Sequence, residues 1–206
     1  MSLTFYYAPR TCALATRIAL EEAGADFDVV RVDFAKGGQR EPDYLKVNPK
    51  GRVPALATER GILTETPAIL AFIAQTHPAA QLMPLDDPFA FAEAQAFNGY
   101  VSSTLHVAHA HGPRGSRWAD DPAAIAEMKR VVPRTVAECF AMIEDRMLKG
   151  PWVLGGSYSV CDAYLFTVAG WMEADQVDPA RFPKVLDHRN RVGERAATKR
   201  ALAADV

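Results

Sequence analysis

The stretch YYAPRTCALATRIALEEAG, residues 6–24, places a cysteine where a strand pattern gives way to a helix pattern. The two tyrosines are typical of a strand end, and the APR that follows is typical of a turn. Leu14 and Ile18 lie four residues apart, which is helical spacing, and Gly24 is a suitable helix end. We therefore expect Cys12 near a helix N-terminus, where free N–H groups and the helix dipole favour a thiolate.

The residues on either side of this stretch alternate between strand and helix patterns. Thr66 and Pro67 are typical of a helix start, with Thr66 as the N-cap and Pro67 as the first helical residue. The predicted order is strand, helix, strand, then strand, strand, helix, and the first unit requires a parallel strand pair with a crossover helix. The expected strands cover residues 3–7, 27–34, 53–58 and 62–64, with helices over 12–23 and from 66 onward.

The pattern changes after Pro78, where a segment rich in proline and aspartate is typical of a linker. Beyond it, apolar residues at helical spacing predict helices and almost no strand, including a long helix kinked at Pro133. Ser159 and Asp162 have capping-box spacing at the start of a helix over 159–172 that is apolar nearly all round. The predicted fold class is therefore α/β followed by all-α, with domains over 1–79 and 88–206 and a linker over 80–87.

Composition limits the classes of function. The net charge of -2 and the pI near 6.2 argue against a nucleic acid or an anionic membrane surface as the partner. No apolar run has the length of a transmembrane helix, and no signal-peptide pattern is found. Three widely spaced cysteines without a CxxC pair do not suggest a disulfide framework, so a cytoplasmic location is expected. We interpret Cys139 and Cys161 as core residues.

Four segments make the pattern more specific. YYAPRTCAL at 6–14, NPKGRVPAL at 48–56, LTETPAIL at 63–70 and SVCDAYLFT at 159–167 follow one another along nearly the whole chain. Together they resemble the cytosolic glutathione transferases, and the first resembles the bacterial, cysteine-bearing (beta-class-like) branch of that family. The resemblance implies a thioredoxin-like N-terminal domain, an all-helical C-terminal domain, glutathione as the co-substrate and a homodimer.

Glutathione carries an ammonium, two carboxylates and a thiol, and the resemblance supplies a residue for each. It implies a cis Pro54, with the backbone of Val53 pairing with the peptide like an added strand. Glu65 would accept the γ-glutamyl ammonium, and Thr66 would bind the neighbouring carboxylate at a helix N-terminus. The thiol would then arrive beside Cys12. The candidate cations for the glycyl carboxylate are Lys36, Lys50 and Arg52.

Cys12 has two possible roles. It could donate a hydrogen bond that stabilises the glutathione thiolate, or it could attack and form a mixed disulfide. Tyr7 and Thr11 are alternatives, because other branches of the family use a hydroxyl near this position.

The helical half contributes further candidates. The resemblance places His106 at the active-site mouth, and Asn98 and Ser102 at positions that reach glutathione from the other subunit. Polar residues of a dimer interface are an equally good interpretation. His106, His109 and His111 lack a supporting acidic residue or cysteine, so we expect no metal. The segment GPRGSRWADDP, residues 112–122, contains Arg114, Arg117 and Trp118, and it either covers an electrophile pocket or forms an exposed loop with a helix start.

The expected function is transfer of the glutathione thiolate to a small apolar electrophile. Two alternatives stay open: a glutathione-dependent thiol transferase or disulfide reductase that uses Cys12 covalently, and a non-catalytic interaction module of the same fold. An isomerase of the maleylacetoacetate type is less favoured, because the Ser-Ser-Cys signature associated with it is absent.

Overall fold

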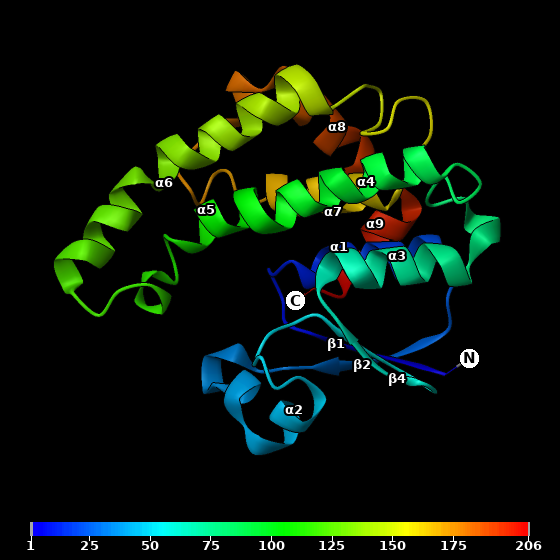
Figure 1. Ribbon diagram of the computed structural model, residues 1–206, viewed down its shortest axis with the longest axis horizontal. Helices are drawn as coiled ribbons and strands as arrows, with labels where there is room; N and C mark the ends of the chain where they lie inside the picture. Colours follow the sequence, from blue (N-terminus) through cyan, green and yellow to red (C-terminus); the bar gives the residue numbers. More distant parts are fainter. Residues whose placement is uncertain (1, 206) are drawn as a thin grey trace.

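A computed structural model describes residues 2–205, and it begins with a four-stranded mixed sheet (Figure 1). The strands are β1 (Leu3–Tyr7), β2 (Phe27–Arg31), β3 (Ala55–Thr58) and β4 (Gly61–Thr64), in the order β2-β1-β3-β4. β1 pairs in parallel with β2, with Phe5 opposite Val29, and the other two pairings are antiparallel. The predicted parallel pair is therefore confirmed.

The helices of this half are α1 (Ala13–Glu22), α2 (Pro42–Val47) and α3 (Thr66–Thr76), with short turns η1 (Phe34–Lys36), η2 (Gly38–Arg40) and η3 (Pro78–Ala80). α1 and α3 lie side by side on one face of the sheet, and α2 lies at the opposite side (Figure 1). Several predicted boundaries differ, among them the start of β3, which is Ala55 and not residue 53. β2 is shorter than the predicted strand over 27–34, because the Asp33 side chain accepts from the N–H groups of Ala35 and Lys36 and starts η1. Thr66 is the first helical residue, and Glu65 is the N-cap.

Helices follow, with no further strand among residues 65–205 apart from an isolated bridge between Trp152 and Gly155. The α-helices are α4 (Pro88–Tyr100), α5 (His106–Ala110), α6 (Pro122–Met142), α7 (Val160–Ala169), α8 (Pro183–Gly193) and α9 (Ala196–Ala203). The π-helical segments η4 (Val101–Leu105) and η6 (Ile143–Met147) continue α4 and α6, and η5 (Gly115–Arg117) and η7 (Pro179–Arg181) are short 3₁₀ turns. The predicted long helix is confirmed as α6, with Pro133 inside it. The predicted capping box of Ser159 and Asp162 is confirmed at the start of α7. No helix within residues 2–205 is long and apolar enough to cross a bilayer.

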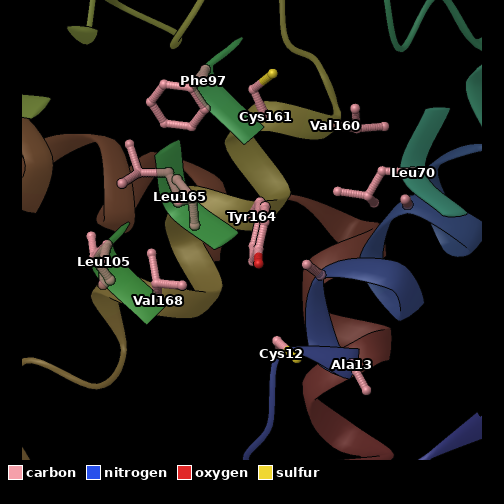
Figure 2. Packing of buried hydrophobic residues seen from close by; sticks show 14 of the residues in the cluster. Cys12, Ala13, Leu70, Phe97, Leu105, Val160, Cys161, Tyr164, Leu165 and Val168 are labelled. Atoms are coloured by element: carbon pink, nitrogen blue, oxygen red, sulfur yellow. The ribbon is translucent and has the colours of Figure 1, made fainter. Parts of the chain in front are cut away.

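The central element of the packing is α1, which contacts α3, α7 and α9. One cluster of buried apolar residues runs from Phe5 in the sheet through Cys12 and Leu70 to Tyr164 and Leu165 on α7. Figure 2 shows the start of α1 facing α7 across this cluster. The first turn of α1, which carries Cys12, is therefore held between the sheet and the helical half.

Candidate functional site

Cys12 is the N-cap residue of α1 and is 8% exposed. Its Sγ donates to the Val53 carbonyl oxygen at 3.6 Å, so the thiol reaches across to the residue before Pro54. The Val53–Pro54 peptide bond is cis, as the resemblance implied. The Val53 N–H has no hydrogen-bond partner among residues 2–205. One backbone donor is therefore available to a bound peptide beside the thiol.

The helix end favours a Cys12 thiolate, but burial of the sulfur has the larger and opposite effect. Burial raises the pKa of the Cys12 thiol, and this effect outweighs the Thr66 side chain and the Arg114 charge, which both lower the pKa. Removal from water disfavours the charged form of a thiol, and this raises its pKa. The sulfur is therefore a hydrogen-bond donor, and it points at a carbonyl group.

Glu65 and Thr66 stand at the start of α3. Glu65 has a positive φ of 73°, and its exposed side chain makes no cap hydrogen bond to the helix. Its Oε1 pairs with Lys50 Nζ at 2.5 Å, and the same Nζ donates to Thr64 Oγ1 at 2.6 Å. A bound ammonium would meet a carboxylate that already accepts from one cation. Thr66 is buried at 4% exposure, next to Cys12.

Tyr164 is a site residue that sequence reasoning missed. It lies on α7, is 1% exposed, and directs its hydroxyl toward the start of α1 in Figure 2. Burial raises the pKa of Tyr164, and the Thr66 side chain within hydrogen-bond reach lowers it. Tyr164 is thus a neutral donor close to Cys12 and Thr66. In the sequence it lies within SVCDAYLFT, a segment that we interpret only as the capped start of a buried helix.

His106 begins α5 and contacts an aromatic group. Its ring lies 5.0 Å from Trp171, which also stacks on His109 at 4.4 Å. His109 Nδ1 is bound to the buried Asp175 at 2.8 Å, so that histidine is fixed in the packing. Burial, followed by the charge of Arg114, lowers the pKa of His106 to about 3. His106 is therefore neutral at neutral pH.

Tyr7 and Thr11 are engaged in local hydrogen bonds. The Tyr7 hydroxyl donates to the Ala204 carbonyl in the C-terminal tail at 3.1 Å. The Thr11 hydroxyl donates to the Ala8 carbonyl at 2.7 Å and accepts from the Ala13 N–H at 3.3 Å, which closes the turn before α1. Both hydroxyls contribute to the packing around Cys12, and neither needs a ligand to be satisfied.

Asn98 and Ser102 differ in their surroundings. Asn98 is fully buried in α4, and neither polar atom of its side-chain amide has a partner among residues 2–205. Its expected approach to glutathione across a subunit interface stays a prediction, and within this chain its amide is enclosed. Ser102 is half-buried and donates to the Gly99 carbonyl at 3.0 Å. Ser103, which is exposed, donates to the same carbonyl at 2.8 Å.

The cations predicted for the glycyl carboxylate are not equivalent. Lys36 is highly exposed and pairs with Asp33 at 3.5 Å, and Lys50 is bound to Glu65. Arg52 is exposed and has no ion-pair partner among residues 2–205. Arg52 is therefore the one of the three predicted cations whose charge is not already engaged.

The remaining candidates lie outside this site. Cys139 and Cys161 are buried, and burial raises the pKa of both thiols, in agreement with their interpretation as core residues. Among residues 2–205, no three histidine, cysteine or acidic side chains gather as they would around a metal ion.

Comparisons with known proteins agree with this geometry. Residues 1–75 match the family described as glutathione S-transferase, N-terminal domain, and residues 122–191 match the corresponding C-terminal domain. The chain is 31% identical to glutathione S-transferase GstA of Escherichia coli O157:H7, over 98% of each chain. It is 26% identical to the disulfide-bond oxidoreductase YfcG of Escherichia coli K12, over 97% of this chain and 94% of that one. A glutathione transferase homologue from Sulfitobacter, solved with bound glutathione, has a TM-score of 0.94 and 46% identity over 97% of this chain and 96% of its own.

Proposed function

We propose that this chain, which belongs to the glutathione S-transferase family, binds glutathione against the start of α1. It then transfers the glutathione thiolate to an electrophile. The main support for the proposal is that the Cys12 thiol, the free Val53 N–H and the Glu65 carboxylate lie together at one end of the strands. Each of these groups complements one part of the tripeptide.

Glutathione would lie along the segment before β3. The Val53 N–H donates to its backbone, Glu65 accepts its ammonium in place of the Lys50 contact, and Thr66 with the N-terminus of α3 binds the γ-glutamyl carboxylate. The Lys50 ammonium that Glu65 releases remains close enough to accompany a carboxylate. Among the predicted cations Lys36, Lys50 and Arg52, we assign the glycyl carboxylate to Arg52.

Cys12 stabilises the thiolate and does not attack in this mechanism. A buried thiol with a raised pKa is a hydrogen-bond donor, and a donor aimed at sulfur favours the ionised form of glutathione. The Tyr164 hydroxyl is a second donor near the same point. The glutathione proton leaves to solvent, a carbon–sulfur bond forms, and the bond from the electrophile to its leaving group breaks.

Other residues have supporting roles. Tyr7 and Thr11 fix the turn that presents Cys12, and neutral His106 faces the acceptor side of the site. A homodimer with Ser102 near its interface is part of the proposal, as are the domain boundaries 1–79 and 88–206 and a cytoplasmic location. Light scattering of the purified protein tests the dimer, with a mass of twice the chain expected.

A second candidate function is disulfide exchange through Cys12, and the relation to the oxidoreductase of Escherichia coli K12 favours it. The raised pKa of Cys12 opposes it, because the thiolate is the attacking species. Mass spectrometry after exposure to oxidised glutathione separates the two functions, since only exchange leaves a glutathione adduct on Cys12.

Calorimetric titration of glutathione into the wild type and Glu65→Gln tests the binding proposal. We expect binding by the wild type and a loss of about tenfold or more in the variant, since a charge-assisted hydrogen bond is worth about 1.5–3 kcal/mol. Glu59→Gln, at an exposed position in the turn between β3 and β4, is the matched control and should bind like the wild type. A folded wild type that does not bind glutathione would overturn the proposal.

A further inference from the structure

Two arginines project from the turn between α5 and α6. Arg114 precedes η5 and Arg117 ends it, and the Arg117 N–H donates to the Arg114 carbonyl at 3.0 Å. Arg114 is the N-cap of η5, and its charge acts on the guanidinium group of Arg117. The turn therefore brings two positive charges near one another.

This pair faces the glutathione side of the molecule. Arg117 lies within electrostatic reach of Arg52 and Arg40, which come from the segment between β2 and β3. His106 lies within reach of Arg114, Arg117 and Arg52, and Cys12 lies within reach of Arg114. The four arginines thus form one cluster across the two halves of the chain, around His106 and next to the thiol.

The cluster has no counter-charge of its own. None of the four guanidinium groups has a carboxylate partner in the ion pairs of residues 2–205. The whole chain carries a net charge of -2, so this concentration of positive charge is local. Like charges without partners repel one another, and burial followed by the charges of Arg114, Arg52 and Arg40 lowers the pKa of Arg117. An anion bound among them would relieve that repulsion.

Glutathione leaves part of this charge unused. Its γ-glutamyl carboxylate belongs at the start of α3, and its glycyl carboxylate requires one cation, which we assigned to Arg52. Arg114 and Arg117 come from the opposite half of the chain, and Arg114 is the one whose charge reaches the Cys12 sulfur. These two arginines therefore face the side from which an acceptor approaches the thiolate.

We propose that Arg114 and Arg117 bind an anionic group, such as a carboxylate, on the acceptor molecule, so that this transferase acts on organic anions and not only on uncharged electrophiles. The proposal rests on the glutathione-transferase function and specifies its substrate class. The guanidinium fork pairs with carboxylate oxygens in a bidentate manner, which orients an acceptor as well as attracting it. Trp118 follows Arg117 in the chain and is 46% exposed, and the part of its ring that does not stack on His111 offers an apolar surface for the rest of the molecule.

Two product analogues test the proposal without requiring turnover. S-benzylglutathione and S-(para-carboxybenzyl)glutathione differ by one carboxylate on the acceptor side. Calorimetry on the wild type should give a Kd about tenfold lower for the carboxylated analogue. Arg114→Gln and Arg117→Gln should each reduce this ratio toward one. Arg130→Gln removes an arginine from the exposed face of α6, where it pairs with Glu127, and should keep the wild-type ratio. High salt should also shrink the ratio, since exposed charges are screened.

The outcomes separate the two proposals. Equal Kd values for both analogues in the wild type would overturn the anion site and leave glutathione binding intact. A variant that weakens both analogues equally would also overturn it, because the arginines would then bind glutathione itself. Failure of the folded wild type to bind either analogue would contradict the proposed function and the anion site together.

Discussion

At the residue scale, two opposing effects act on Cys12. Its position at the start of α1 favours a thiolate through the helix dipole, worth about 0.3–1 kcal/mol for a charge at a helix end. Its burial among apolar side chains favours the neutral thiol, and burial can shift a pKa by several units. Burial prevails, so Cys12 acts as a donor, and the sulfur that ionises in this account belongs to glutathione.

Alkylation of Cys12 by iodoacetamide should therefore keep accelerating up to high pH. Because the pKa of this thiol lies above its ordinary value, the thiolate fraction is small at neutral pH and continues to grow above pH 9. Peptide mass spectrometry follows the rate at Cys12, with N-acetylcysteine as the reference and Cys12→Ser as the control for assignment. An inflection at lower pH than that of the reference would show an activated cysteine and favour the exchange mechanism.

His106 should make the folded state sensitive to acid. Its pKa is about 3 in the folded protein and 6.5 ordinarily, so between these values the unfolded chain binds a proton that the folded chain does not. The free energy of unfolding should then fall as the pH drops below 6.5. Urea unfolding at pH 7.5 and pH 5 should show a loss roughly 1 to 2 kcal/mol larger in the wild type than in His106→Leu. Equal losses would contradict the lowered pKa.

The sequence predicts part of the site and not the rest, for physical reasons. Cys12, Pro54 and Glu65 stand in short continuous motifs at element boundaries, where local pattern is informative. Tyr164 and Arg114 lie near Cys12 only through tertiary packing, which their own sequence segments do not specify. The inward orientation of Asn98 likewise depends on the helix phase of α4.

At the element scale, α7 is held at its start by a buried hydrogen-bond network. Asp162 accepts from the N–H groups of Ser159 and Val153 at 2.7 Å each, from the Ser159 hydroxyl at 2.9 Å, and lies 2.9 Å from His188 Nε2. All four of these contacts are buried. The network thus joins α7 to α8 and to the segment before α7.

Asp162→Ala should lower the free energy of unfolding by about 3 kcal/mol, because it leaves several buried donors without a partner. The matched control is Asp178→Ala, which removes an exposed cap from the short turn η7 and should cost no more than about 1 kcal/mol. Urea unfolding measures both. Similar costs for the two variants would mean that the network adds nothing beyond an ordinary cap.

Element types follow from the sequence better than element ends. The buried helix at 160–169 and the long α6 have strong apolar patterns, and Pro133 remains inside α6, as the continuing pattern predicted. The end of β2 depends on the Asp33 side chain, which competes for backbone N–H groups after the strand. The start of α3 moves by one residue because Glu65 adopts a conformation of positive φ that no propensity predicts.

At the scale of the whole molecule, the two halves share one apolar core. α1 packs against α7 and α9, and Arg195 Nη2 pairs with Glu22 Oε2 at 2.8 Å to join the region before α9 to α1. The C-terminal tail is also bound to the first half, through Tyr7 and Ala204. The site at Cys12 therefore depends on both halves being in place.

Unfolding should accordingly occur in one cooperative step. All three tryptophans lie in the helical half, so their fluorescence reports that half, whereas far-ultraviolet circular dichroism reports both. The two urea curves should coincide in the wild type, and Arg195→Gln should move both by the same amount, about 1 kcal/mol. A separate dichroism transition without a fluorescence change would show that the halves unfold independently.

The role of Cys12 as a donor to the glutathione thiolate is tested by the pH dependence of kcat/KM for chlorodinitrobenzene at saturating glutathione, compared between the wild type and Cys12→Ala. In the wild type we expect the apparent pKa of glutathione to lie below the value of a free thiol, about 8.5. In Cys12→Ala the apparent pKa should rise toward that value, because a donor to the thiolate has been removed. Cys139→Ala, at a core cysteine away from the site, should keep the wild-type profile. Identical pH profiles for the wild type and Cys12→Ala would show that Cys12 does not stabilise the glutathione thiolate.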